Sequence, residues 1–199
     1  MSRIARTSFG FACVLLLAAG MAQAESPDPS KVPGVGTVAP AFGLYPLPQG
    51  TKAEKKPGGR EAVQLDEYCG LRPNETELVL LAFVDASGTI LDGDPLTTWY
   101  RKYHRDGLEI LAISLERNPA EFAARVKRAR LPFPVLDDRQ GVVAQRYGVD
   151  KAPFVFLLNS QCRVLGVDNK GPADLKEALT GTFERVLSGI EDTPSTPPE

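Results

Sequence analysis

One apolar run in the middle of the chain limits the possible folds more than any other feature. Residues 78–84, with the sequence LVLLAFV, are apolar without interruption. Such a run is typical of a strand that is covered on both faces, as in a parallel sheet, and a buried helix is the less favoured alternative. The chain has 199 residues, of which 43% are hydrophobic, so it can bury one such sheet in a single domain.

The segments after this run alternate between helix and strand patterns. Asp94-Pro95 provides an N-cap and a first-turn proline for a helix that is expected to reach Gly107, and residues 108–114 return to a strand pattern. The remaining expected elements are a helix over 118–130 with Asn118 as its N-cap, a short strand at 133–136, one or two helical turns over 141–147, a hairpin of 153–158 with 163–167, and a closing helix that includes 175–187. This order predicts an α/β fold with a mixed sheet and helices on both faces.

Two further strand candidates come before the apolar run. They are residues 41–47 and 60–65, and we expect them to form a β-hairpin extension at the N-terminal side of the domain. The loop between them, 50–59, is rich in lysine and is interpreted as a solvated loop rather than as a binding patch.

The two ends of the chain carry signals for location. Arg3 and Arg6 precede an apolar run and the triplet Ala22-Gln23-Ala24, which is the pattern of a cleavable secretory signal peptide. We therefore expect a signal peptide over 1–24 that is cut after Ala24, a linker over 25–36, the folded domain over 37–190 and a disordered tail over 191–199. The apolar run between Arg6 and Ala22 is too short to span a bilayer comfortably. The mature protein is expected in the periplasm or outside the cell, without a stable membrane anchor.

Composition argues against several functions. With 23 Lys and Arg against 25 Asp and Glu, the formal net charge is -2, which is not typical of a nucleic-acid-binding protein. The chain has one histidine and three cysteines, and it contains neither a CxxC nor an HExxH motif. These residues are too few for a zinc cluster, so we expect neither a metal site nor a cofactor.

Four stretches in this order resemble the thioredoxin fold, and specifically the exported redoxins of the TlpA/ResA type in the alkyl hydroperoxide reductase and thiol-specific antioxidant superfamily. The resemblance covers about residues 35–188. The stretches are 35–44 (VGTVAPAFGL), Ala82-Phe83 at the end of the apolar run, 133–138 (FPVLDD) and 147–153 (YGVDKAP). The resemblance implies a three-layer α/β/α sandwich, and it implies a cis peptide bond between Ala152 and Pro153, against the redox site.

The same resemblance shows where this chain departs from the family. The redox pair of the family would fall at Gly88 and Leu91, and residues 84–91 contain no cysteine. Dithiol exchange needs a thiolate nucleophile and a second thiol that resolves the mixed disulfide, so neither that reaction nor a peroxidase of the family type is expected here. The only histidine, His104, is expected in the middle of the helix that follows and not in a catalytic position. The groove at this loop remains a candidate binding site, formed by Asp85, Ser87, Gly88, Thr89, Ala152 and Pro153.

The two cysteines of the mature chain are Cys69 and Cys162. On the fold that the resemblance implies, both lie at the end of the sheet opposite the redox loop and therefore near each other. An even number of cysteines in an oxidising compartment suits a disulfide. Three alternatives stay open: a structural disulfide, two free thiols, or a redox pair in an unusual place.

Three hypotheses for function follow. The first is a thioredoxin-fold protein without the dithiol that binds an envelope protein or a peptide in an extended form by strand addition. The second is a thiol oxidoreductase or antioxidant enzyme that uses Cys69, Cys162 or both. The third is a structural subunit of an envelope assembly with Trp99, Tyr100 and Tyr103 at an interface, although these aromatic residues are interpreted more simply as core. We favour the first.

Overall fold

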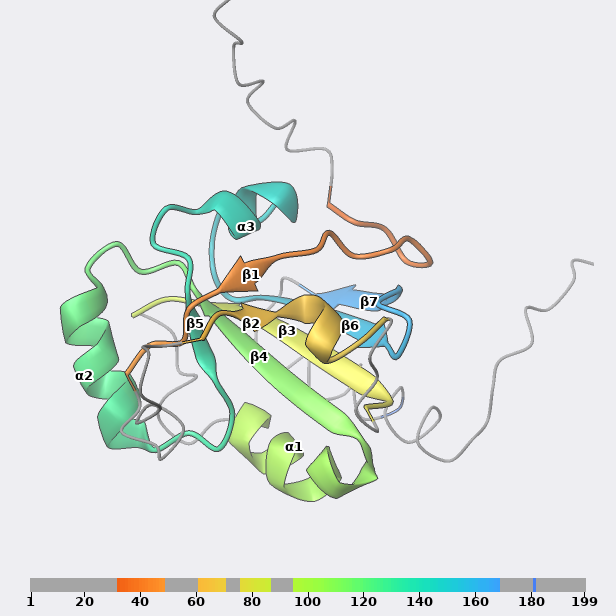
Figure 1. Ribbon diagram of the computed structural model, residues 1–199, viewed down its shortest axis with the longest axis horizontal. Coiled ribbons are helices and arrows are strands. Elements are labelled where there is room, and N and C mark those ends of the chain that lie inside the picture. Colours follow the sequence, from red (N-terminus) through yellow and green to blue (C-terminus); the bar gives the residue numbers. More distant parts are fainter. Residues whose placement is uncertain (1–31, 49–60, 71–75, 87–94, 169–180, 182–199) are drawn as a thin grey trace, which may run out of the picture.

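The computed structural model describes residues 32–48, 61–70, 76–86 and 95–168, together with Gly181. A five-stranded sheet in the order β5-β4-β3-β6-β7 forms its centre (Figure 1), and a separate two-stranded sheet pairs β1 with β2. The strands are β1 Gly43–Leu44, β2 Val63–Gln64, β3 Leu78–Val84, β4 Leu108–Ser114, β5 Val135–Asp137, β6 Phe154–Asn159 and β7 Val164–Asp168. The helices are α1 Pro95–Tyr103, α2 Pro119–Ala129 and α3 Val142–Arg146, with short 3-10 turns η2 Leu65–Glu67 and η4 His104–Asp106. The mixed α/β architecture confirms the expected fold class.

The apolar run that dominates the sequence is the central strand. Every residue of β3 is buried, and β3 pairs in parallel with β4 and antiparallel with β6. A strand between two neighbours and under helices on both faces has no solvated side, so its sequence is continuously apolar rather than alternating. The predicted hairpin is also present, because β6 and β7 pair antiparallel across the turn at 160–163.

Alternate side chains of the strands enter two separate cores. One core packs β3 and β4 against α1 and α2 and includes Leu96, Trp99 and Phe122. The other packs the opposite face against α3, β1 and η2, on the upper side of the sheet in Figure 1, and includes Phe42 and Tyr147. Trp99 and Tyr103 are buried in the first core, as expected for core residues.

Two local predictions were wrong in detail. α1 ends at Tyr103, and His104 lies in the 3-10 turn that follows rather than in the middle of a helix; Gly107, with φ 94°, ends this turn. α2 begins at Pro119 as predicted, but the side chain of Asn118 makes no capping hydrogen bond. Instead, the Asn118 amide donates to Glu116 Oε1 at 3.1 Å, so the acidic side chain before the helix orders this turn.

The predicted strands at 41–47 and 60–65 form the expected hairpin, but β1 and β2 are only two residues long. The chain after β1 leaves β2 and pairs with β5 instead: the Leu47 amide donates to the Val135 carbonyl at 2.7 Å, and the Asp137 amide donates to Tyr45 at 2.9 Å. Upstream, Gly36 and Ala39 donate to Val164 and Cys162 beside β7. The N-terminal segment therefore crosses one face of the sheet and pairs with strands at both edges, which covers part of each edge.

Several predictions concern residues outside the described ranges. They are the signal peptide over 1–24, the loop over 50–59, the tail over 191–199 and, apart from Gly181, which is helical, the closing helix that includes 175–187. Within the described part of the chain, no helix combines the length and the apolar character that a membrane crossing requires.

Candidate functional site

The candidate groove begins where β3 ends. In the antiparallel register Phe83 lies opposite Phe154, so Pro153 lies beside Val84 and the following Asp85. The Ala152–Pro153 bond is cis, as the resemblance implies. Asp85, Ala152 and Pro153 are all partly exposed at this end of the strands. The structure thus brings together two of the segments that were assigned to one groove.

Helix α2 holds the start of the loop that follows β3. Arg125 of α2 donates a hydrogen bond from Nη1 to the carbonyl oxygen of Ala86, 39 residues earlier in the chain. The other predicted groove residues, Ser87, Gly88 and Thr89, lie outside the described residues, as does Leu91. No local sequence pattern indicated the contact between Arg125 and Ala86, because it joins distant segments.

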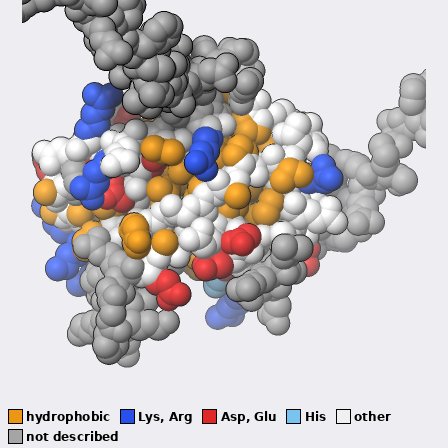
Figure 2. Space-filling view, turned by 45° about the horizontal axis from the view of Figure 1, so that its top comes forward, with side chains coloured by type: hydrophobic (Ala, Val, Ile, Leu, Met, Phe, Trp, Pro, Cys, Tyr) orange, Lys and Arg blue, Asp and Glu red, His pale blue; other side chains and the backbone are white. Residues whose placement is uncertain are grey.

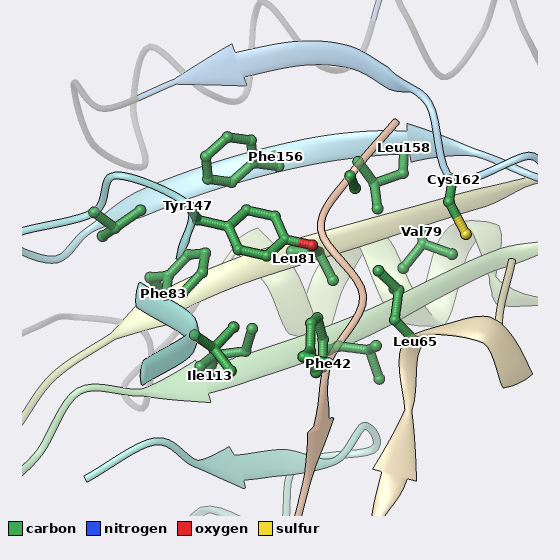
Figure 3. Close-up of a cluster of buried hydrophobic side chains, with 14 of the residues drawn as sticks. Phe42, Leu65, Val79, Leu81, Phe83, Ile113, Tyr147, Phe156, Leu158 and Cys162 are labelled. Atoms are coloured by element: carbon green, nitrogen blue, oxygen red, sulfur yellow. The ribbon is translucent and has the colours of Figure 1, made fainter. Parts of the chain in front are cut away.

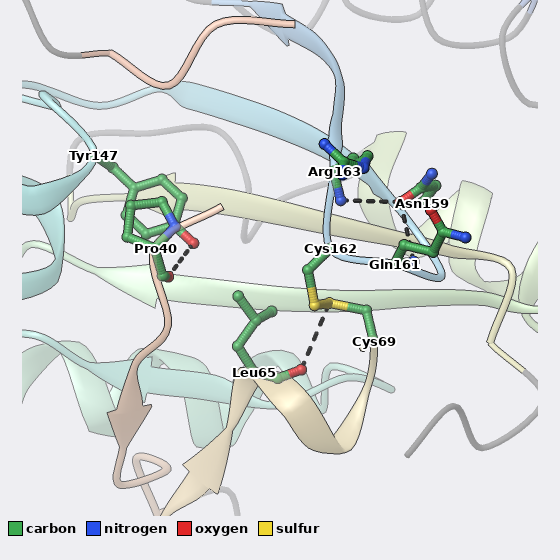
Figure 4. Close-up of a disulfide and its surroundings, with 8 residues drawn as sticks. All are labelled: Pro40, Leu65, Cys69, Tyr147, Asn159, Gln161, Cys162 and Arg163. Carbon is green, nitrogen blue, oxygen red and sulfur yellow. Dashed lines mark hydrogen bonds between the residues drawn. A yellow bond between two sulfur atoms is a disulfide. The ribbon is translucent and has the colours of Figure 1, made fainter. Parts of the chain in front are cut away.

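A group of aromatic rings packs against the sheet near this end of β3 and β6 (Figure 3). The ring centroid of Tyr147 is 5.6 Å from that of Phe83 and 5.1 Å from that of Phe156, and Phe154 stacks on Phe156 at 5.1 Å. The Tyr147 hydroxyl donates to the carbonyl oxygen of Pro40 at 2.8 Å (Figure 4). Burial raises the pKa of Tyr147, so the phenol stays protonated and remains a donor. This cluster fixes the N-terminal segment over the strand that leads into the groove.

The two cysteines form a disulfide at the other end of the sheet. Cys69 and Cys162 have Cα atoms 5.2 Å apart and close a separation of 93 residues (Figure 4). Cys69 is fully buried and Cys162 is 9% exposed. The pairing confirms that the two residues lie near each other, as the implied fold predicts. Of the three alternatives, two free thiols are excluded in this structure.

Local hydrogen bonds position both halves of the disulfide. The Cys69 amide donates to the carbonyl of Leu65 at 3.1 Å, at the end of the 3-10 turn η2. Cys162 has φ 57° in the β6–β7 turn, where the Asn159 side chain accepts from the amides of Gln161 and Arg163 at 3.0 and 2.9 Å. The amide of Gly70 also donates to Ser160 at 2.7 Å. Asn residues commonly stabilise tight turns through hydrogen bonds between the side chain and nearby backbone amides, as the Asn159 side chain does here.

A cluster of ionisable residues at this same end of the sheet was not predicted. His104 stacks on Tyr100, and its Nδ1 atom lies 3.2 Å from Glu109 Oε1. Burial raises the pKa of Glu109, whereas His104 lowers it. Burial, with smaller contributions from Glu109 and Tyr68, raises the pKa of Tyr100 to about 12, which makes it a poor nucleophile. This cluster therefore lacks the features of a catalytic triad.

The described residues hold no group of three or more His, Cys, Asp or Glu side chains that could bind a metal ion. They do form a hollow elsewhere that the sequence did not indicate. It lies between the segment around β1 and the helix α3, with a volume of about 470 Å³. It is separate from the groove at Pro153, because it lies beside β5, three strand positions away from β6 along the sheet.

The parallel strands β3, β4 and β5 and the antiparallel hairpin of β6 and β7, in the sheet order β5-β4-β3-β6-β7, define a thioredoxin-like protein. The model of the AhpC/TSA family matches residues 35–177, and the chain belongs to this family. Curated relatives include the thiol-disulfide oxidoreductase ResA of Geobacillus thermodenitrificans, 30% identical over 86 residues, which are 43% of each chain. The ResA of Geobacillus kaustophilus is 31% identical over 97 residues, 46% of this chain and 49% of that one. The chain spans less than half the length of these relatives.

Solved structures show the same fold. A protein of Chlorobium tepidum, assigned as the thiol:disulfide interchange protein DsbE, superposes with a TM-score of 0.63 at 23% identity and covers 78% of this chain and 99% of its own. The thioredoxin domain of a thiol-disulfide oxidoreductase from Bacteroides vulgatus superposes with a TM-score of 0.57 at 18% identity, with 75% and 98% of the two chains covered. These similarities support the three-layer fold, with the β1–β2 hairpin as an addition at its N-terminal side.

Proposed function

We propose that this protein is an exported thioredoxin-fold protein that binds an extended protein or peptide segment without dithiol exchange. One observation carries the proposal. The chain has three cysteines, Cys13, Cys69 and Cys162, and the last two are bonded to each other at the end of the sheet opposite the groove. The positions that correspond to the redox pair of the family are Gly88 and Leu91, by the spacing from Phe83.

The chemistry of exchange explains why this observation matters. A thiolate must attack the disulfide of the substrate, and a second thiol must then resolve the mixed disulfide. The hydroxyl groups of Ser87 and Thr89 cannot replace these thiols, because they remain protonated and form no redox couple. The alternative, thiol chemistry at Cys69 and Cys162, has less support because the sulfur of Cys69 is completely buried.

The groove keeps features that suit binding. Asp85 follows the end of β3 and Ala152 precedes the start of β6, so the two partly exposed residues lie at the same end of adjacent strands, and Arg125 anchors the backbone at Ala86. A partner in an extended conformation could form backbone hydrogen bonds there, as in strand addition. The proposed groove comprises Asp85, Ser87, Gly88, Thr89, Ala152 and Pro153. The N-terminal pattern that ends at Ala24 supports export, so the partner would be an envelope protein or a peptide.

The first test asks whether the loop after β3 lacks dithiol exchange only because residues 88 and 91 are not cysteines. The mature protein should not reduce insulin with dithiothreitol as the electron donor. The double variant Gly88→Cys/Leu91→Cys should gain this activity, because it restores a CxxC pair at the proposed position. Insulin reduction by the unmodified protein would contradict the proposal. A matched control, Gly34→Cys/Thr37→Cys, places the same spacing on the N-terminal segment and should stay inactive.

The second test addresses binding through the backbone. A fluorescein-labelled peptide, GSVTVTVTGS, should bind saturably to the mature protein, and N-methylation of alternate Val amides should abolish binding by removing the donors. Methylation of the same peptide at the Thr amides is the matched control, since those amides face away from the groove when the Val amides face it. Equal affinity for all three peptides would count against strand addition.

A further inference from the structure

The hollow between β1 and α3 combines an apolar interior with exposed apolar side chains. Phe42 and Val143 are buried beneath it, whereas Tyr45 is 59% exposed and Val142 is 42% exposed. Large apolar side chains that are exposed singly are ordinary on a protein surface. Here, however, two of the five large hydrophobic residues that are exposed in the described part of the chain line the same hollow.

The acidic groups in this hollow are already satisfied. Asp137 accepts hydrogen bonds from the backbone amide of Arg139 at 3.2 Å and from Nε of its side chain at 2.9 Å. Asp138 is only 3% exposed, and its two oxygens accept from the amides of Val143 and Ala144 at 3.2 and 2.8 Å. These carboxylates therefore stabilise the turn into α3 and are not available to attract a cation.

A basic group on the wall of the hollow is not neutralised in the same way. Arg146 donates from Nη1 to the carbonyl oxygen of Ala41 at 3.2 Å, and no carboxylate of the described residues forms an ion pair with it. A guanidinium has five donors, so most of its donors can still bind a carboxylate. Figure 2, in which the top of Figure 1 comes forward, shows hydrophobic side chains across this face with both basic and acidic side chains among them.

We propose that this hollow, defined by Phe42, Tyr45, Val142, Val143 and Arg146, is a docking site for a protein segment that presents an apolar side chain next to a carboxylate. The apolar side chain fills the volume between Phe42 and Val143, and the carboxylate pairs with Arg146. A protein segment suits the site better than a small free acid, because Tyr45 and Val142 extend the apolar surface onto the rim. Tyr and Arg are also enriched among the residues that dominate binding at protein interfaces.

This proposal is independent of the groove at Pro153. The hollow lies beside β5 and the groove lies at the start of β6, with β4 and β3 between them. If one site does not bind its peptide, the proposal for the other site is unaffected. The two proposals can therefore be tested separately on the same protein.

The experiment measures binding of labelled octapeptides to the mature protein by fluorescence anisotropy. All three peptides are amidated at the C-terminus: GSELFEGS carries both the apolar and the acidic groups, GSQLFQGS lacks the carboxylates, and GSESSEGS lacks the apolar side chains. Only the first should bind saturably, and salt should weaken it because a charge pair contributes. Arg146→Gln and Tyr45→Ser should each weaken binding by about tenfold or more, and Arg146→Lys should keep part of the affinity.

Matched controls lie on the opposite edge of the molecule. Arg163→Gln removes an exposed arginine beside β7, and Val35→Ser removes a valine that is 70% exposed, so neither should change the affinity. Absence of saturable binding by GSELFEGS, equal binding of all three peptides, or affinity that Arg146→Gln and Tyr45→Ser leave unchanged would each overturn the proposal. Equally tight binding of 3-phenylpropionate alone would overturn it too, by making the ligand a small organic acid. The circular dichroism spectrum of each variant verifies that it is folded.

Discussion

At the end of the sheet where β3 begins, a disulfide joins the turn after η2 to the turn between β6 and β7, and the amide of Gly70 adds a hydrogen bond across the same junction. At the end where β3 finishes, the residues beside Pro153 are partly exposed and the contact from α2 is made by a side chain. In the family of this chain, the second end is where the redox chemistry is expected. The difference places the disulfide of this protein at the end of the sheet opposite the groove that we propose for binding.

The strongest way to break this comparison is to remove the disulfide. The double variant Cys69→Ser/Cys162→Ser should lose about 3–5 kcal/mol in the free energy of unfolding, because the bond closes a loop with a separation of 93 residues and so restricts the unfolded chain. Urea denaturation of the oxidised wild type and the variant measures the difference. Each single variant should lose about as much as the double variant. A loss below about 1 kcal/mol would show that the bond does not hold this end together.

A smaller effect is expected from a cap near the opposite end. Asp138→Ala should cost about 1–2 kcal/mol, because the buried carboxylate accepts from the first amides of α3. The neighbouring Asp137→Ala is the matched control. It removes an ion pair with the exposed Arg139 and should cost clearly less than Asp138→Ala. Equal losses in urea denaturation would mean that burial does not distinguish the two carboxylates.

The hydroxyl of Tyr147 tests the link between the N-terminal segment and the aromatic cluster. Tyr147→Phe should cost about 0.5–1.5 kcal/mol, since it removes one hydrogen bond and leaves the carbonyl of Pro40 without this donor. Hydrogen exchange at Ala39 should become faster in the variant, because its amide bonds to Cys162 from the same segment. Tyr45→Phe changes an exposed residue and should leave both measurements unchanged. Unaltered exchange at Ala39 in Tyr147→Phe would separate the two contacts.

The smallest effect concerns Glu109 at the disulfide end. Burial raises its pKa, so the folded protein keeps this proton to higher pH than the unfolded chain does. Stability that depends on this group is therefore full below about pH 4 and falls as the pH rises through the folded pKa. The free energy of unfolding of Glu109→Gln, relative to that of the wild type, should therefore be higher at pH 7 than at pH 4. The gain should stay below about 1 kcal/mol, because the side chain is partly exposed and His104 opposes the shift.

Urea denaturation at the two pH values measures the Glu109 effect. Glu77→Gln, which changes an exposed carboxylate just before β3, is the matched control for the substitution. A loss of stability on neutralising Glu109 at pH 7 would mean that its ion pair with His104 outweighs burial.

Local sequence predicted the elements whose patterns do not depend on distant partners. The apolar run became β3, and the polar turn between two apolar segments became the β6–β7 hairpin. The closeness of Cys69 and Cys162 and the cis bond before Pro153 came from the resemblance and not from the pattern of residues. These features depend on topology, which a local pattern does not contain.

The errors and omissions have a common physical cause. The short length of β1 results from pairing of residues 45–47 with β5, about 90 residues later, and no local propensity encodes that choice. The same holds for the contact between Arg125 and Ala86, and for the hollow between β1 and α3, which exists only after both segments are placed. The early end of α1 had no comparable local signal, because Gly107, with its positive φ, ends the 3-10 turn η4 and not α1 itself.

The most direct test of the central claim is a redox titration of the mature protein, with thiol alkylation and mass spectrometry at each potential. We predict that Cys69 and Cys162 stay bonded to below about −300 mV, as is typical of structural disulfides, because the bond is buried. A pair that exchanges near about −200 mV would contradict the account, because the sulfur chemistry would then be catalytic or regulatory rather than structural.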